Sequence, residues 1–257
     1  MNAFVFAGGY GTRLRPYTLT VPKPMLPVFG RPMVAYVLAG LARAGVRHAT
    51  VNAAWLADSF DVLPAMGPEL GLEIAISKQK KPLQHGGDLA VATAFWDLLS
   101  PDEVFLAANG DTLYDLDGPA LAAAATSVTA AAPLLFLGDR RDDGGLRVRA
   151  GRLVGIGDVD YVASTDADGP EERWDDAGLK FFHATVRALL PPPGTEMSLH
   201  GREGLVGRII AAGGTVHVAP APIRARAEIG TVAAYEAHPN DAALHALTRR
   251  LMGEDEG

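Results

Sequence analysis

The 257-residue chain contains no cysteine. This absence excludes disulfide bonds, thiolate nucleophiles and metal centres with cysteine ligands, and it favours a reducing compartment. The N-terminus lacks the basic start and long apolar stretch of a secretory signal, because residues 1–7 run directly into Gly8 and Gly9. We therefore expect a cytoplasmic protein without an export signal.

Long hydrophobic runs are also scarce. The longest uncharged segment, residues 118–138, contains Pro119 and Pro133, three hydroxyl side chains and an alanine-rich first half. This composition predicts a surface helix followed by a buried strand, and no membrane span.

Acidic side chains are missing from the first 57 residues, which carry six lysines and arginines and hence a charge of +6. The whole chain has a net charge of -7. An acidic total disfavours nucleic acid as a partner, but the basic N-terminal quarter is suited to a smaller anion.

Short apolar segments alternate with helical patterns over the first 137 residues. Strands are expected near residues 3–7, 48–53, 72–77, 103–108 and 128–137, with helices at 32–44, 55–66 and 88–99. Such alternation predicts an α/β fold with a mainly parallel central sheet flanked by helices. Antiparallel strands are expected as additions at 146–149 and 152–156, and an exposed loop is expected at 166–176. Further strands are expected near 215–219 and 223–229, and helices at 203–212 and 231–248. We expect one domain over residues 1–250 and a flexible acidic tail at 251–257.

The most informative segment follows the first expected strand. Gly8, Gly9 and Gly11 permit unusual backbone angles and close approach of backbone N–H groups to a phosphate. The loop lacks the Gly-Lys-Ser/Thr ending of a P-loop and the third glycine at the spacing of a dinucleotide-binding loop. An ordinary turn therefore remains an alternative at this point. Ten residues further on, Lys23 stands between two prolines that stiffen its backbone. A planar arginine fork at position 13 and a compact lysine charge would suit polyphosphate, although a lysine alone is more often merely solvated.

These motifs resemble the sugar-1-phosphate nucleotidylyltransferases, also called nucleotide-sugar pyrophosphorylases. Members of that family carry a glycine-rich loop ending in Gly-Thr-Arg-Leu and a downstream Pro-Lys-Pro-Met, as residues 8–14 and 22–27 do here. The resemblance continues through residues 41–45, 82–87, 109–111 and 230–231, and is loose between 139 and 200. It implies a Rossmann-like (GT-A-like) nucleotidyltransferase fold, in the short form without a C-terminal β-helix.

The resemblance also implies a reaction and its residues. A nucleoside triphosphate and a sugar or cyclitol 1-phosphate would give a nucleotide sugar and pyrophosphate. Arg13, Lys23 and Asp111 would be catalytic, and Mg²⁺ would be held by Asp111 and by Glu228, which stands where relatives usually carry aspartate. From the residues alone, an aspartate in a turn such as Asp111 is more often structural.

Substrate contacts follow from the same resemblance. The expected nucleotide-binding residues are Ala7, Gly8, Gly9, Gly11, Thr12, Arg13, Gln79, Gln84, Gly86 and Gly87. Gln84 and His85 replace small residues of the family's second glycine-rich loop, and they either contact the base or fill the turn. The expected sugar-phosphate contacts are Lys23, Asn109, Gly178, Lys180 and Arg226.

Two other functions stay open. The departures at Glu228, Arg226 and the second loop would also fit a degenerate, nucleotide-binding paralogue with a regulatory role. The poorly matched sugar region leaves room for transfer to a non-sugar phosphate or phosphonate. The sequence selects neither the base nor the sugar, and homo-oligomers are expected only because relatives often form them.

Overall fold

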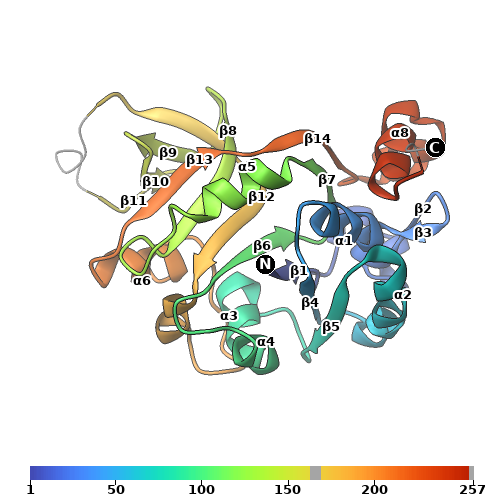
Figure 1. The fold of residues 1–257 in the computed structure, drawn as a ribbon, viewed down its shortest axis with the longest axis horizontal. Coiled ribbons are helices and arrows are strands. Elements are labelled where there is room, and N and C mark those ends of the chain that lie inside the picture. Colours follow the sequence, from blue (N-terminus) through green and yellow to red (C-terminus); the bar gives the residue numbers. More distant parts are fainter. Residues whose placement is uncertain (163–168, 255–257) are drawn as a thin grey trace. The chain divides into compact units, whose positions relative to one another are not determined.

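The computed structural model describes residues 1–162 and 169–254. The chain forms two compact units, which appear in Figure 1. Unit 1 comprises Met1–Pro82, Asn109–Leu121 and Pro222–Gly257, and unit 2 comprises Leu83–Ala108 and Ala122–Ala221. Each unit is thus built from segments far apart in the sequence; the blue N-terminal and red C-terminal elements of Figure 1 both belong to unit 1. The expectation of one domain stays a prediction.

Unit 1 contains three parallel strands. β4 (His48–Ala53) pairs with β1 (Asn2–Phe6) and with β5 (Glu73–Lys78), as the sequence predicts. Their inner residues are apolar and buried, including Phe4 and Val51, each 0% exposed. The helices of this part are α1 (Met33–Arg43) and α2 (Leu63–Leu70). Because parallel strands present their carboxyl ends at one edge, the loops after β1 and β4 lie together.

Two antiparallel pairs complete unit 1. β7 (Thr112–Leu116) pairs with β14 (Ile223–Glu228), and the short β2 (Pro27–Val28) pairs with β3 (Arg31–Pro32). α1 packs directly on β7, since a Cβ placed on Gly40 would lie 2.2 Å from the carbonyl oxygen of Tyr114. The remaining helices are α5 (Gly118–Ala125), which continues into unit 2, α7 (Val232–Ala237) and α8 (Ala242–Leu251).

Unit 2 is built around β12 (Glu172–His183). This strand is antiparallel to β6 (Val104–Asn109), β8 (Leu134–Arg140) and β9 (Leu146–Arg149). The other strands are β10 (Arg152–Ile156), β11 (Val159–Asp160) and β13 (Val216–Pro220), and the helices are α3 (Gln84–Val91), α4 (Thr93–Asp97) and α6 (Leu205–Ala211). Its core is aromatic, with Phe105 stacked on Phe182 at 5.5 Å between ring centroids.

Three fold expectations are corrected. The sheet is mixed, as the antiparallel additions predict, but it is not mainly parallel, because among the pairings described in unit 2 only β8 and β13 are parallel. The exposed loop expected at 166–176 already becomes β12 at Glu172, while residues 163–168 lie outside the described residues. The acidic tail does not begin at 251, since Leu251 ends α8 and is 3% exposed; residues 255–257 of that expected tail lie outside the described residues.

Candidate functional site

The glycine-rich loop follows β1 in unit 1. Of its three glycines only Gly11 has a positive φ, 62°, and a Cβ there would lie 2.9 Å from the Thr18 side chain. The Thr18 hydroxyl donates a hydrogen bond to the Gly11 carbonyl at 2.9 Å, which fixes this turn. Gly8 is buried against Asn52, whereas Gly9 and Tyr10 are exposed. The loop therefore has a rigid base and an open tip whose backbone can face a ligand.

Lys23 is the buried cation of unit 1. It opens a short 3-10 turn, Lys23–Met25, between Pro22 and Pro24, and its side chain is only 8% exposed. Its Nζ lies 2.6 Å from Asp111 Oδ2 and 4.0 Å from Glu228 Oε1. The two prolines restrict the backbone around the lysine, so the ammonium is held between two carboxylates that stand 117 positions apart in the sequence.

Arg13 joins the same group from the glycine-rich loop. Its guanidinium lies 3.5 Å from Glu228 Oε1, and the two side chains are 70% and 51% exposed. Such an exposed pair adds little stability and separates easily. The structure thus brings together four predicted residues: Arg13, Lys23, Asp111 and Glu228.

Pairing of β7 with β14 explains how the two carboxylates meet. Glu228 lies opposite Thr112, the residue after Asp111. Gly110 leads into this turn, and its N–H donates to the Phe6 carbonyl at 2.9 Å. A Cβ on Gly110 would lie 3.0 Å from the same oxygen, so a larger residue would push the turn outward. Arg226 lies on the same face of β14 as Glu228, because side chains alternate along a strand.

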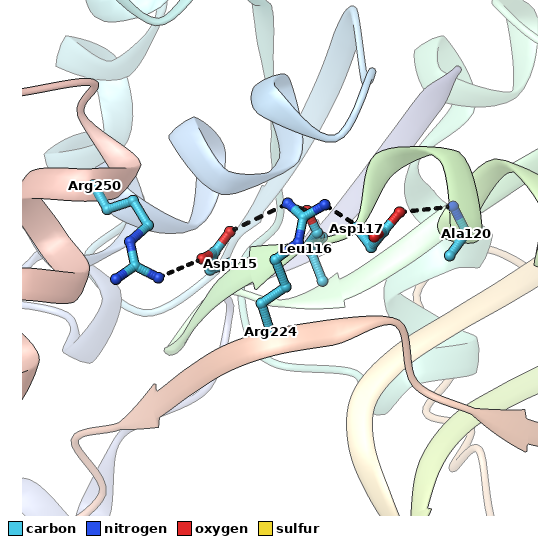
Figure 2. A network of polar contacts seen from close by, with 6 residues as sticks. All are labelled: Asp115, Leu116, Asp117, Ala120, Arg224 and Arg250. Carbon is cyan, nitrogen blue, oxygen red and sulfur yellow. Dashed lines mark hydrogen bonds and ion pairs between the residues drawn. The ribbon is translucent and has the colours of Figure 1, made fainter. Parts of the chain in front are cut away.

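A polar network joins β14 to β7 and α8, as Figure 2 shows. Asp115 of β7 is 10% exposed at its side chain and lies 3.0 Å from Arg250 of α8 and 4.0 Å from Arg224 of β14. Arg224 also bonds the Leu116 carbonyl at 3.2 Å and Asp117 at 2.9 Å. The N–H of Ala120 donates to Asp117 and, with Arg224, holds the pKa of this carboxyl below its usual value. The network thereby ties the strand that carries Glu228 to the strand that follows Asp111.

The donor set fits a hard cation. Carboxylate oxygens are the ligands that Mg²⁺ prefers, and it usually takes one or two of them together with substrate phosphates. Asp111 and Glu228 supply two such groups within 4.0 Å of one ammonium nitrogen. Among residues 1–162 and 169–254 no group of three or more potential metal ligands occurs, so further ligands would come from substrate or water.

The second glycine-rich loop lies in unit 2 at the start of α3. Gln84 adopts φ 62°, a backbone conformation that residues other than glycine rarely adopt. The N–H groups of Gly86 and Gly87 both donate to the Met197 carbonyl, at 2.9 and 3.3 Å. A Cβ on Gly86 would lie 2.7 Å from the Met197 side chain. Packing against this segment therefore accounts for both glycines, and Gln84 is the exposed residue of the loop.

Lys180 is the buried cation of unit 2. Its side chain is 4% exposed, and its Nζ lies 2.8 Å from Asp176 Oδ2 and 5.3 Å from the centre of the Phe136 ring. Gly178 has φ 81° and donates its N–H to the same aspartate at 2.8 Å. Burial, followed by the positive charges of Lys180 and His200, lowers the pKa of His85 to about 4, against the pull of Asp176. This cluster therefore presents an ion pair beside a neutral imidazole at pH 7.

The other predicted residues have plainer surroundings. Ala7 is 4% exposed, so only its backbone is open to contact, and Thr12 is exposed at the start of a 3-10 turn. Gln79 follows β5 directly and donates its N–H to Ala53 at 2.9 Å. Asn109 is the last residue of β6 and partly exposed.

Sequence reasoning missed two features. Asn52 is 0% exposed beside Gly8, and Asp176 is the partner of Lys180. A polar residue near the end of an apolar strand was the available signal for Asn52. Asp176 gave a weaker signal, because residues four positions apart in a regular strand are too far apart for contact. The bulge between Asp176 and Leu179 is what brings Asp176 to Lys180.

Known proteins resemble this chain in sequence and in fold. A family model described as Nucleotidyl transferase matches residues 2–143. Over 116 residues the chain is 37% identical to mannose-1-phosphate guanylyltransferase catalytic subunit beta of Danio rerio, covering 45% of this chain and 32% of that protein. Over 129 residues it is 36% identical to N-acetylmuramate alpha-1-phosphate uridylyltransferase of Neisseria meningitidis serogroup B, covering 50% and 54%. The chain thus spans about a third and about half of the length of these two relatives.

A solved structure supports the fold over nearly the full length. The inositol-1-phosphate CTP transferase from T. maritima superposes with a TM-score of 0.69 at 20% identity, covering 97% of this chain and 95% of that one. Within the described parts of the chain, none of the helices combines the length and the apolar character needed to cross a membrane.

Proposed function

Because the chain belongs to the nucleotidyl transferase family, we propose that it transfers a nucleotidyl group from a nucleoside triphosphate to a sugar or cyclitol 1-phosphate. The products are a nucleotide sugar and pyrophosphate. The observation that carries this proposal is the position of Lys23, whose ammonium lies between Asp111 and Glu228. A buried cation, two carboxylates and an exposed arginine suit a substrate that brings both phosphates and a metal ion. The names of the relatives point to the same class of acceptor.

In the proposed reaction, a phosphate oxygen of the sugar 1-phosphate attacks the α-phosphorus of the triphosphate. The bond from this phosphorus to the oxygen bridging the α- and β-phosphates breaks, and pyrophosphate leaves with the bonding electrons. No covalent intermediate on the protein is needed, so catalysis rests on alignment and on neutralising charge. Arg13 holds the departing β- and γ-phosphates, and Lys23 bridges the phosphates of both substrates.

Mg²⁺ is the proposed cofactor, with Asp111 and Glu228 as its ligands. When bound, the cation would offset negative charge on the α-phosphate. Glu228 is one methylene longer than the aspartate usual at this position, yet its oxygen lies within 4.0 Å of the ammonium that Asp111 binds. Lys23 pairs with both carboxylates in the free protein and would exchange them for phosphate oxygens when substrates bind.

Each unit contributes a different set of substrate contacts. In unit 1, the proposed nucleotide contacts are Ala7, Gly8, Gly9, Gly11, Thr12, Arg13 and Gln79; in unit 2 they are Gln84, Gly86 and Gly87. Since the amides of Gly86 and Gly87 already bond Met197, hydrogen bonding to the base falls to Gln84. The proposed sugar-phosphate contacts are Lys23, Asn109 and Arg226 in unit 1, and Gly178 and Lys180 in unit 2.

The test is pyrophosphate release for five nucleoside triphosphates against a panel of sugar and cyclitol 1-phosphates, with Mg²⁺ or with chelator. We expect turnover for at least one pair, with Mg²⁺ only. Arg13→Met should lower it strongly, whereas Arg15→Met, at an exposed arginine two residues away, should leave it nearly unchanged.

Other outcomes separate the alternatives. Triphosphate binding without turnover on any acceptor, phosphonates and choline phosphate included, would indicate a regulatory paralogue and refute the proposal. Turnover only with a non-sugar phosphate would mean that the acceptor is a non-sugar phosphate, and not a sugar or cyclitol 1-phosphate. A cytoplasmic location and a homo-oligomer stay predictions.

A further inference from the structure

Asn52 is a buried amide without partners near the glycine-rich loop. The residue is 0% exposed, and neither its Oδ1 nor its Nδ2 has a hydrogen-bond partner among the residues that the structure describes. Buried amides in folded proteins are nearly always hydrogen-bonded, because leaving one unpaired forfeits its interaction with water. A side chain with both polar ends unpaired therefore calls for a physical explanation.

The position of Asn52 suggests one. It is the penultimate residue of β4, where it lies opposite Phe6 of β1 and Ser77 of β5. A Cβ placed on Gly8 would lie 2.4 Å from Asn52 Oδ1 and 3.3 Å from its Cγ. The backbone of the glycine-rich loop thus rests directly on the amide, and only glycine at position 8 allows this approach.

The strand itself does not require asparagine. Its neighbours Val51 and Ala53 are buried and apolar, and a leucine, though larger, would keep the same branching at Cγ without orphaned polar atoms. Proteins break such packing rules mainly at functional sites, so the amide points to a role in the loop that rests on it.

We propose that Asn52 is a positioning residue for the glycine-rich loop. When the nucleotide's phosphates bind, backbone groups of Gly8 and Gly9 turn to hydrogen-bond the Asn52 amide, and this contact fixes the loop around the ligand. Glycine can change its backbone angles at low cost, and Gly9 has open space around its Cα. The inference rests on the proposed function, since it requires a nucleotide in this loop.

The consequence is a loss of binding without a matching loss of stability. Asn52→Leu should leave the midpoint of thermal unfolding of the free protein nearly unchanged, because the removal of two unpaired groups offsets the larger volume of leucine. The same variant should weaken triphosphate binding at least tenfold and raise the KM for the triphosphate by a similar factor, with kcat within threefold. Thr50→Val is the matched control, because Thr50 is a buried polar residue on the same face of the same strand; it should leave nucleotide binding unchanged.

The experiment uses the full chain with Mg²⁺ and each of five nucleoside triphosphates, without acceptor, in calorimetric titrations, together with thermal unfolding of the free proteins. If Asn52→Leu unfolds at a lower temperature and binds nucleotide as the wild type does, the amide is structural and the inference is overturned. Equal weakening by Thr50→Val would overturn it too, because any change in β4 would then act alike. If the wild type binds none of the five, the proposed function itself fails, which is a different result from normal binding by Asn52→Leu.

Discussion

Lys23 in unit 1 and Lys180 in unit 2 are both buried lysines that pair with one aspartate. Their side chains are 8% and 4% exposed, and their ammonium nitrogens lie 2.6 and 2.8 Å from Asp111 and Asp176. Their neighbours differ. Lys23 has a second carboxylate at 4.0 Å, which belongs to an exposed residue paired with Arg13. Lys180 has an aromatic ring at 5.3 Å, and its charge adds to the burial that lowers the pKa of His85.

This difference indicates different tasks. Around Lys23 the charges are numerous and partly exposed, so phosphates and a cation can replace the pairs that the free protein makes. Around Lys180 the only carboxylate within 4 Å among the described residues is that of Asp176, which is 26% exposed, and the other neighbours are an aromatic ring and an imidazole. Such surroundings suit neutral hydroxyl groups. We therefore propose that unit 1 neutralises charge and that unit 2 recognises the ring of the acceptor.

The largest expected effect comes from removing the charge of Asp111. Asp111→Asn should lower kcat at least about a hundredfold, because the variant loses the carboxylate that we propose as a metal ligand near the developing charge. Pyrophosphate release at saturating substrates measures it. Asp58→Asn, at an exposed carboxylate of the same unit, is the control. Near-normal turnover of Asp111→Asn would refute both the metal assignment and the contrast between the two lysines.

Lys180 should affect the acceptor alone. Lys180→Met should raise the KM for the sugar phosphate about tenfold, equivalent to roughly 1.4 kcal/mol, and leave the KM for the triphosphate within twofold. Steady-state kinetics with each substrate varied in turn would separate the two constants. Lys80→Met, at an exposed lysine, controls for the loss of charge. Equal changes in both KM values would mean that unit 2 does not act on the acceptor specifically.

His85 should make the stability of the protein depend on pH. Because its pKa falls to about 4 in the folded chain, the unfolded chain binds the proton first when the pH drops below 6.5. Stability should therefore be lost as the pH falls, by roughly 1 kcal/mol between pH 7 and 5.5. Denaturant unfolding at both pH values measures this change.

The difference between wild type and His85→Gln isolates the contribution of His85, since burial also lowers the pKa values of His200 and His217. The variant should lose less stability over this interval. An identical loss of stability in both proteins would mean that the imidazole of His85 is not buried.

The smallest expected effect is at Gln84. Gln84→Gly should stabilise the protein by about 0.5 to 1 kcal/mol, since glycine adopts φ 62° without strain. If Gln84 contacts the base, the variant should also discriminate less between the nucleoside triphosphates. Ala150→Gly, at φ 47°, should give similar stabilisation with unchanged preference. Stabilisation without any change in preference at Gln84 would assign this glutamine to the turn alone.

The two units also differ in how far the sequence predicts them. Short sequence segments are enough to predict three features of unit 1: the loop after β1, Lys23 between its prolines, and Asp111 after its strand. The structure places these features together with Glu228. The pairing of β7 with β14 joins strands more than a hundred positions apart, and no local pattern signals it. Glu228 could therefore be named only through the family resemblance.

Unit 2 was harder to predict because its geometry arises between strands. The bulge in β12 brings Asp176 to Lys180, and an antiparallel arrangement replaces the parallel one that alternating strands and helices favour. Gln84 and Gly178 adopt backbone angles that depend on their surroundings rather than on their immediate neighbours in sequence. Asn52 shows the same limit in unit 1, since only its burial beside Gly8 makes it unusual.

Arg250 gives helix α8 an influence on chemistry that its distance in sequence from the motifs would not suggest. Its contact with Asp115 at 3.0 Å ties the last turn of α8 to β7, next to the strand that carries Glu228. Arg250→Met would leave every recognisable motif intact. Among the described residues it would leave Asp115 paired only with Arg224, at 4.0 Å, so the substitution would resemble an active-site mutation in its effect on activity. Genetic screens for loss of function should accordingly recover hits in this last turn.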